Sequence, residues 1–432
     1  MNFELKIKNA NSFQDRFLLT VSLLTIIRIG SFIPLPYVDL KLNSSSLIST
    51  SNTTNTVTTI LNSFSGGNNS SISILSLGIL PNINASIIIQ LLTTINPTLL
   101  KLQKEEGEYG RRKLTDYTRY LTFFCALVES IITTYSFRSL VFDWNILIIL
   151  QISLSLLTGS MIILWFSELI TKNGIGNGSS LLICFNIVSN FPDQLKALSL
   201  TLVNQNILII STISGLFLLT TIGCIYINEA LIKIPLISAS QLLRKVSKTS
   251  LWNNSNLPLR VNQAGVMPLV FTSSIMVILS YFIKFIYLEL KDIKIISVLS
   301  FISPDTLGLI TKGLYWFIYG LLVFFFTTFY SRIILDPKDI AEEFRKNSVS
   351  IKGINPGLST RNYLSQTIKR LTIINAIFLI VVLILLNGLE SILPVSNLNL
   401  RGFGLTSQLI LVNILIDTFR KVQSLLKAED IL

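Results

Sequence analysis

Residues 81–120 read PNINASIIIQLLTTINPTLLKLQKEEGEYGRRKLTDYTRY, and this stretch decides the class of protein. An apolar segment that contains Asn82, Asn84, Ser86 and Gln90 runs into a dense cluster of charges, and a second apolar segment follows. A helix that faces only lipid avoids such polar groups, because they are costly in hydrocarbon. The pattern therefore predicts a helix that lines a wet or gated path through a bilayer and ends in a positively charged loop.

The composition of the chain also indicates a membrane protein. Half of the 432 residues are hydrophobic and 13% are charged, against roughly 25% charged in soluble domains, and the mean hydropathy is +0.63. A helix needs about 20 apolar residues to cross the hydrocarbon. Ten spans are predicted, at about 17–36, 73–95, 117–137, 146–169, 178–192, 207–230, 264–288, 313–334, 371–393 and 404–420.

The formal net charge of +12 is explained by membrane topology. Most of the Lys and Arg residues lie in loops on the side of the N-terminal segment 1–16 and the C-terminal tail 421–432. Cytoplasmic loops carry such an excess, so both ends are expected in the cytoplasm, or in the stroma of a plastid. No nucleic acid is needed to account for the charge.

Two loops on this side, 231–263 and 332–370, are longer than a turn between helices requires. Two explanations remain open, namely ordinary topogenic charge beside anionic lipid and docking of a cytosolic partner. The candidate docking residues are Arg244, Lys245, Lys248, Arg345, Lys346, Lys352, Asn355 and Arg361.

The segment TVTTILNSFSGG, residues 56–67, is predicted to form a short helix on the opposite side of the membrane. Its apolar residues recur at helical spacing, and glycines end it. It is too short to span, so it lies on the surface or folds back into a cavity. The residues concerned are Thr56, Val57, Ile60, Leu61, Phe64, Gly66 and Gly67.

Metal and cofactor chemistry find little support in the sequence. The chain has no histidine, and its three cysteines lie far apart in apolar segments without metal-ligand spacing. No cofactor is expected, and no P-loop motif is present to bind ATP. An intramembrane enzyme would need paired acids or a nucleophile–base set, and Asp417 stands alone. A secondary transporter of a small solute remains the alternative.

Six motifs together resemble one family. They are RIGSFIPLP (28–36), FSGGNNSSISILSLGILPNINASIIIQLL (64–92), GEYGRRKLTDYTRYLT (107–122), GIGNGSS (174–180), LPLRVNQAGVMP (257–268) and GLTSQLILVNILID (404–417). Over roughly residues 15–425 they follow one another in the same order as in the SecY family. Members of this family are the pore subunits of the Sec protein-conducting channel. The resemblance implies an all-α polytopic membrane protein with ten transmembrane helices. It also implies two pseudo-symmetric inverted halves, 17–195 and 196–420, and a re-entrant plug helix formed by 56–67.

The resemblance also implies the functional residues. The hydrophobic pore ring of the family falls on Ile83, Ile87, Ile183, Ile187, Val270 and Ile410. The two isoleucine pairs are spaced i, i+4, which places each pair on one helix face. The lateral gate of the family lies between spans two and three and spans seven and eight. Its polar candidates here are Gln90, Thr93, Glu129, Asn262 and Gln263.

The loop segment GINPGLSTRNYL, residues 353–364, matches the family's docking loop for its motor or ribosome. Asn355 stands where the family commonly has an arginine, which puts that charged contact in doubt. The resemblance implies a SecE-type small subunit, a SecG-type subunit, a SecA-type ATPase or ribosome, and substrate preproteins and membrane proteins. The absence of a transit peptide and a composition typical of an AT-rich genome favour a plastid thylakoid membrane, with a bacterial inner membrane as the alternative.

Overall fold

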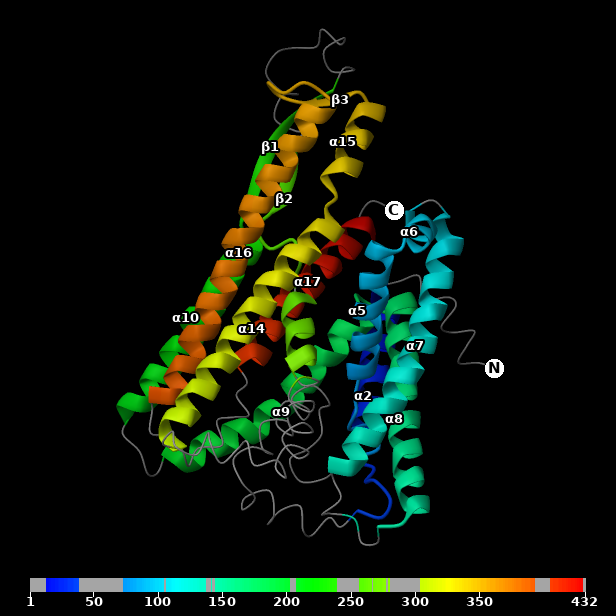
Figure 1. Ribbon diagram of the computed structural model, residues 1–432, viewed down its shortest axis with the longest axis vertical. Helices are drawn as coiled ribbons and strands as arrows, with labels where there is room; N and C mark the ends of the chain where they lie inside the picture. Colours follow the sequence, from blue (N-terminus) through cyan, green and yellow to red (C-terminus); the bar gives the residue numbers. More distant parts are fainter. Residues whose placement is uncertain are drawn as a thin grey trace, which may run out of the picture. The chain divides into compact units, whose positions relative to one another are not determined.

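A computed structural model describes most of the predicted helices and the loops on one side of them (Figure 1). The described residues are 13–38, 73–104, 106–136, 141, 144–202, 207–238, 256–265, 267–276, 279, 304–392 and 405–429. The chain forms two compact units, which are described separately. The first is Met1–Asn206 with Ser273–Tyr287 and Val395–Leu432, and the second is Ile207–Thr272 with Leu288–Pro394. The predicted plug helix, 56–67, lies outside the described residues.

Each of the ten predicted spans overlaps a helix. The helices are α2 (Phe13–Gly30), α5 (Leu80–Ile95), α7 (Gly107–Ser136), α8 (Ile146–Asn173), α9 (Gly178–Leu202), α10 (Ile207–Glu229), an unlabelled helix Met267–Met276, α14 (Pro304–Ile334), α16 (Leu358–Ile392) and α17 (Leu405–Glu429). Among the described residues, three stretches are long and apolar enough to cross a membrane, namely Ile146–Asn173, Trp316–Lys346 and Leu358–Leu385. The count of ten spans therefore stays a prediction.

Several helices, including α7 and α16, begin well before the apolar segments that predicted them. α7 begins at Gly107 and α16 at Leu358, although the apolar segments begin near 117 and 371. Hydropathy marks only the part of a helix that matches the hydrocarbon, whereas hydrogen bonding along the backbone continues into water. At about 1.5 Å per residue, the 35 residues of α16 give a rod of about 50 Å, longer than the roughly 30 Å of hydrocarbon.

The first unit is a helical bundle. α5 packs on α7, α7 on α8, and α8 on both α2 and α9, while α17 packs on α9. A short helix, α6 (Pro97–Lys104), connects α5 to α7. One apolar cluster joins the segment after α2, the segment before α5, and α8; it comprises Leu35, Val38, Leu77, Ile152 and Leu156.

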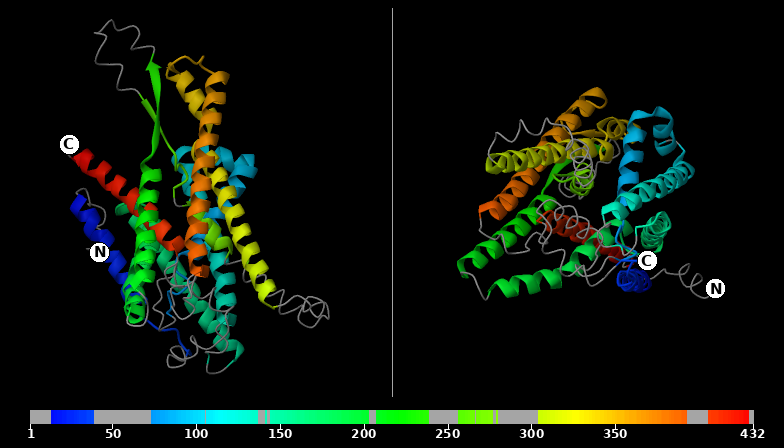
Figure 2. Two further views of the ribbon diagram at one scale, coloured as in Figure 1. Left: turned by 90° about the vertical axis from the view of Figure 1, so that its left-hand side faces the viewer. Right: turned by 60° about the horizontal axis from the view of Figure 1, so that its bottom comes forward.

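The second unit contains a sheet that the sequence analysis did not foresee. β1 (Leu231–Ser238) continues from α10 (Figure 2) and pairs antiparallel with β2 (Asn256–Arg260) and β3 (Val349–Ile351), in the order β2-β1-β3. The long loops 231–263 and 332–370 thus meet in one folded element. It also contains α15 (Pro337–Lys346), whose first turn is capped by the Asp336 carboxylate accepting from the Lys338 backbone N–H at 3.0 Å.

Two prolines explain why the sequence did not predict these strands. Ile234 and Leu236 flank Pro235 on β1, and Leu257 and Leu259 flank Pro258 on β2. Alternation of this kind predicts strands. Pro235 and Pro258 argue against such a reading, because proline cannot donate to a ladder. Pro235 instead contributes its carbonyl, which accepts from the Lys352 N–H at 3.3 Å.

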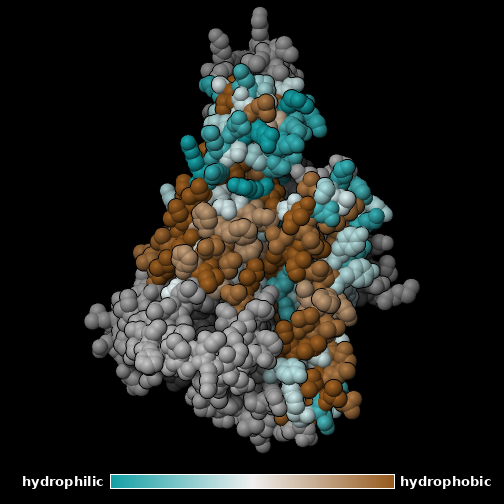
Figure 3. All heavy atoms as spheres, viewed as in Figure 1, coloured by the Kyte–Doolittle hydropathy of each residue, from teal (hydrophilic) through white to brown (hydrophobic). Residues whose placement is uncertain are grey.

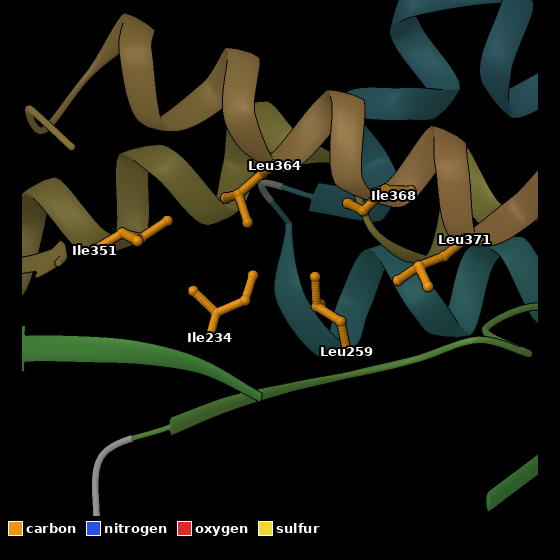
Figure 4. Packing of buried hydrophobic residues seen from close by; sticks show 6 residues of the cluster. All are labelled: Ile234, Leu259, Ile351, Leu364, Ile368 and Leu371. Carbon is orange, nitrogen blue, oxygen red and sulfur yellow. The ribbon is translucent and has the colours of Figure 1, made fainter. Parts of the chain in front are cut away.

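The sheet is held against the first turns of α16 by an apolar core (Figure 4). Side chains from β1, β2 and β3 face those of α16. The core residues are Ile234, Leu259, Ile351, Leu364, Ile368 and Leu371. Hydrophilic residues gather over this end of the unit, and hydrophobic residues gather over its helices further along (Figure 3). The core therefore builds a folded element outside the apolar part of the helices.

From this core we expect alanine substitutions at two leucines of α16 to differ in their effect on stability. Leu364 is fully buried, whereas Leu358 is 75% exposed. Leu364→Ala is expected to destabilise the sheet by about 2–5 kcal/mol because it leaves a cavity, and Leu358→Ala by much less. Hydrogen exchange of the β1 amides in the reconstituted chain measures this. Equal loss of protection in both variants would contradict the packing in Figure 4.

Candidate pore-lining and docking sites

The start of α5 is fixed by the segment Ser73–Ile79. The Ile74 N–H donates to the Ile33 carbonyl at 3.1 Å, and Gly78 has φ of 58°, a left-handed conformation that favours glycine. Pro81 then lies in the first turn of α5, where its missing N–H costs nothing. With the helix beginning at this point, Ile83, Asn84 and Ile87 lie among its buried residues.

The predicted pore-ring residues are all buried in the structure. Five of them lie in the first unit, on α5, α9 and α17, and Val270 lies in the second. None is more than 6% exposed; the set is Ile83, Ile87, Ile183, Ile187, Val270 and Ile410. Burial agrees with either a closed constriction or ordinary packing, so the ring remains a prediction.

The turn between α8 and α9 orients Ile183 and Ile187. A Cβ on Gly178 would lie 2.0 Å from the Ser167 carbonyl oxygen, so only glycine allows this approach. The Gly178 N–H donates to the Thr171 hydroxyl at 2.9 Å. The motif GIGNGSS is thus used to pack the start of α9 tightly against the end of α8.

Polar side chains join α5 to α7. The Asn84 amide donates to a carboxylate oxygen of Glu129 at 2.5 Å, and the Thr122 hydroxyl lies 3.4 Å from the Asn82 amide oxygen. Of the gate candidates in this unit, Thr93 is buried and bonds the Gln90 carbonyl within its own helix at 2.8 Å. Glu129 is therefore engaged with the neighbouring helix of its own unit.

An ion pair between α7 and α8 was not predicted. The Arg119 guanidinium donates to both carboxylate oxygens of Glu168, at 2.7 and 2.5 Å, and one nitrogen also reaches Asp116 at 3.0 Å. Two parallel bonds of this kind fix geometry as well as charge. The sequence could have predicted this pair, because Arg119 and Glu168 lie in adjacent predicted spans, each near the end that faces the charged loops.

Asn262 belongs to a buried amide network in the second unit. Its Nδ2 donates to Asn228 of α10 at 2.6 Å, and its Oδ1 accepts from Asn375 of α16 at 3.1 Å and from the Gly265 N–H at 3.0 Å. Beside it, the Gln263 amide oxygen accepts from Ser331 of α14 at 2.8 Å. Sequence analysis singled out Asn262 and Gln263 but missed their partners, which lie far away in the chain.

The docking candidates of the second long loop lie on the surface of the sheet element. Two glycines with positive φ, Gly353 at 80° and Gly357 at 110°, shape the loop that carries Asn355. The Asn355 carbonyl accepts from the buried Thr360 hydroxyl at 2.9 Å. Arg345, Lys346, Lys352, Asn355 and Arg361 are all exposed. Arg244, Lys245 and Lys248 lie outside the described residues.

Within the described part of the chain, no group of three or more Cys, Asp or Glu residues is placed to hold a metal ion. A small cavity lies between α2, α8 and α9. Its lining includes Arg28, whose guanidinium donates to Ser189 at 3.2 Å, together with Ser31 and Asn186. Many described Ser and Thr hydroxyls bond a carbonyl of their own helix, as Thr93 does, whereas Asn84, Arg119 and Glu129 join helices.

Comparison with known proteins identifies the family. The family model described as SecY matches residues 73–419. The chain belongs to the SecY family. A protein translocase subunit SecY from Vaucheria litorea is 57% identical over 433 residues, which cover 100% of this chain and 99% of the relative. SecY from Synechococcus elongatus is 39% identical and covers 97% of this chain and 94% of the relative.

Solved structures of SecY-type channels share the fold at low sequence identity. A structure of a protein-conducting channel aligns with a TM-score of 0.64 at 16% identity, covering 96% of this chain and 92% of that one. Sec61 from a canine ribosome–channel complex aligns with a TM-score of 0.59 at 15% identity, with coverage of 96% and 92%. The SecY motifs quoted from the sequence are thus carried on the expected channel fold.

We expect a side chain at Gly159 of this SecY-family chain to clash with the segment that precedes α5. A Cβ on Gly159 of α8 would lie 2.2 Å from the Ile74 carbonyl oxygen, whereas a Cβ on Gly215 of α10 meets no atom within 4 Å. Gly159→Ala is expected to destabilise the chain by about 1–3 kcal/mol through overpacking. Gly215→Ala is expected to stabilise it by up to about 1 kcal/mol through helix propensity.

The measurement is the denaturant dependence of unfolding of both variants in the same detergent or nanodisc. If Gly159→Ala is as stable as Gly215→Ala, the close approach of α8 to residue 74 is wrong.

Proposed function

We propose that this chain is the pore subunit of a Sec translocase. It passes unfolded polypeptides across a membrane and releases hydrophobic segments sideways into the bilayer. The observation that carries this proposal is the full-length match to SecY translocase subunits together with the fold of a protein-conducting channel. The chain performs no covalent chemistry in this proposal, so the driving force comes from outside.

The proposed constriction is the ring of Ile83, Ile87, Ile183, Ile187, Val270 and Ile410. Branched aliphatic side chains make a narrow apolar passage that excludes water and ions when it is closed. Such side chains have no hydrogen bonds to break, so the ring can widen around a polypeptide. All six side chains are buried, which is compatible with a closed constriction; the support for the assignment is the match of their motifs to the SecY family. The segment 56–67 is proposed to act as a plug on the far side of the ring.

Lateral release requires a seam that is only weakly held. We place it along spans two and three and spans seven and eight, with Gln90, Thr93, Glu129, Asn262 and Gln263 as polar candidates. An apolar signal helix shifts the equilibrium toward the open state by binding that state preferentially. The hydrogen bonds of Asn262 and Gln263 to α10, α14 and α16 would fix the start of the seventh span during this movement.

The sheet element is proposed as the docking surface for the external motor. It presents Arg345, Lys346, Lys352 and Arg361 around the loop with Asn355, and its apolar core makes it a rigid support. The partners proposed are a SecA-type ATPase or a ribosome, a SecE-type small subunit and a SecG-type subunit. The canine Sec61 relative was solved in a ribosome–channel complex, which supports ribosome binding.

A plastid thylakoid membrane is the proposed location, with a bacterial inner membrane as the alternative. Relatives from algae and cyanobacteria support both. Detection of the chain in isolated thylakoids, and its absence from the plastid envelope, would establish the first of these.

Crosslinking tests the ring. A photoreactive residue at Ile83 or Val270 is expected to crosslink to a stalled translocating chain, because both would face the passage. The matched control is Ile88 on α5, which is 40% exposed and directly follows Ile87 in the sequence. Proteoliposomes with the partner subunits and an arrested substrate provide the measurement. Absence of crosslinks from both positions, with the substrate engaged, would remove the ring assignment.

Charge reversal tests the docking surface. Arg345→Glu combined with Lys346→Glu is expected to reduce motor-stimulated translocation at least tenfold, since two attractive contacts become repulsive. The control is Lys427→Glu on the C-terminal helix α17, an exposed cation outside the sheet element. Binding of the SecA-type ATPase to each variant is measured at low and physiological salt. If Lys427→Glu reduced binding and translocation as much as the double variant does, the role of these charges would be nonspecific and the docking surface would be wrong.

A further inference from the structure

Glu129 is an acidic residue in the apolar part of α7, and its partner is an amide. The Asn84 Nδ2 donates to Glu129 Oε1 at 2.5 Å. No charged residue occurs in α5, whose sequence is LPNINASIIIQLLTTI. Among the described residues, no ion pair includes Glu129. A carboxylate in such surroundings would be a charge held by a single neutral donor, which is costly inside a bilayer.

The Asn84 side chain is only half satisfied in this arrangement. Asn84 is 8% exposed, and its Oδ1 has no hydrogen-bond partner within the described structure. An ionised carboxylate offers only acceptors, whereas a protonated carboxyl offers one O–H donor. If Glu129 carries a proton on its second oxygen, that O–H can donate to Asn84 Oδ1 while Asn84 Nδ2 continues to donate to Oε1. The Asn84 oxygen and the carboxyl group of Glu129 would then both have a partner.

We propose that Glu129 is a neutral carboxylic acid in the resting chain and forms a two-bond acid–amide pair with Asn84. The proton is taken from solvent during folding, and no other bond changes. Two antiparallel bonds resist rotation of α5 about its axis better than one bond does. Asn84 follows Ile83 directly and precedes Ile87 by three residues, so the pair positions both isoleucines. This positioning role rests on the proposed function, because it matters only if these residues form the ring.

Among the residues that the structure describes, no cation lies within ion-pair distance of Glu129. On its own helix the nearest titratable neighbour is Cys125, one turn earlier. The ion pair of Arg119 with Glu168 of α8 lies ten residues away along α7, which is about 15 Å. Glu168 has the opposite surroundings, because its two oxygens accept from the guanidinium of Arg119, a permanent cation.

This contrast gives an infrared test with a matched control. The full chain with its partner subunits is placed in lipid nanodiscs at neutral pH, and difference spectra are recorded against the variants. Wild type minus Glu129→Gln is expected to show the carbonyl band of a protonated, hydrogen-bonded carboxylic acid. Wild type minus Glu168→Gln is expected to show only carboxylate bands. A carboxylate signal in place of the acid band for Glu129 would overturn the proposal.

A second variant guards against misfolding of the first. In Asn84→Leu the acid band of Glu129 is expected to persist but to shift to higher frequency, because its hydrogen bonds to the amide are lost. An unshifted band would show that Asn84 is not the partner, and would also overturn the proposal. Neither spectrum depends on translocation, so their failure is distinct from failure of the proposed function, which the crosslinks from Ile83 and Val270 test.

Discussion

Polar groups inside a bilayer must find their partners within the protein, and this constraint organises both units. Backbone groups are satisfied by helices, so the remaining question concerns the side chains. In the first unit, Asn84 meets Glu129 and Arg119 meets Glu168. In the second, Asn262 meets Asn228 and Asn375. Each pair in the first unit joins two helices, and Asn262, which lies in the segment after β2, links α10 to α16. Packing of aliphatic side chains alone would leave these helices free to slide, because lipid is as apolar as leucine.

A translocation channel uses this constraint in a particular way. A path that admits both polar and apolar segments cannot be lined throughout by strong hydrogen-bonding groups, because they would hold the substrate. Aliphatic residues such as Ile83 and Ile187 suit a lining that must open and close, whereas amides and charges suit the contacts that hold helices in register. In the described structure the pairs Asn84–Glu129 and Arg119–Glu168 do connect helices within the first unit. This division supports the proposed roles of the two kinds of residue.

Outside the apolar part of the helices, the chain follows the rules of soluble proteins. The sheet of β1, β2 and β3 has a hydrophobic core with α16, an N-capped helix in α15, and charged residues on its surface. The proposed docking surface would have to transmit force without deforming, and its six buried aliphatic residues would give it the required stiffness. The same helix, α16, runs from this core into the apolar part of the second unit.

The sequence by itself determined the class of the protein, the places of the helices and the family, because hydropathy and short motifs are local properties. It marked Glu129, Asn262 and Gln263 as unusual, since polar groups in apolar segments need an explanation. It did not predict that Asn84, Asn228 and Asn375 are the partners of these groups. It also did not predict the sheet, whose strands contain Pro235 and Pro258. Those were decided by the tertiary structure alone, because a hydrogen bond between segments more than one hundred residues apart, such as Asn262 to Asn375, depends on packing that no local pattern contains.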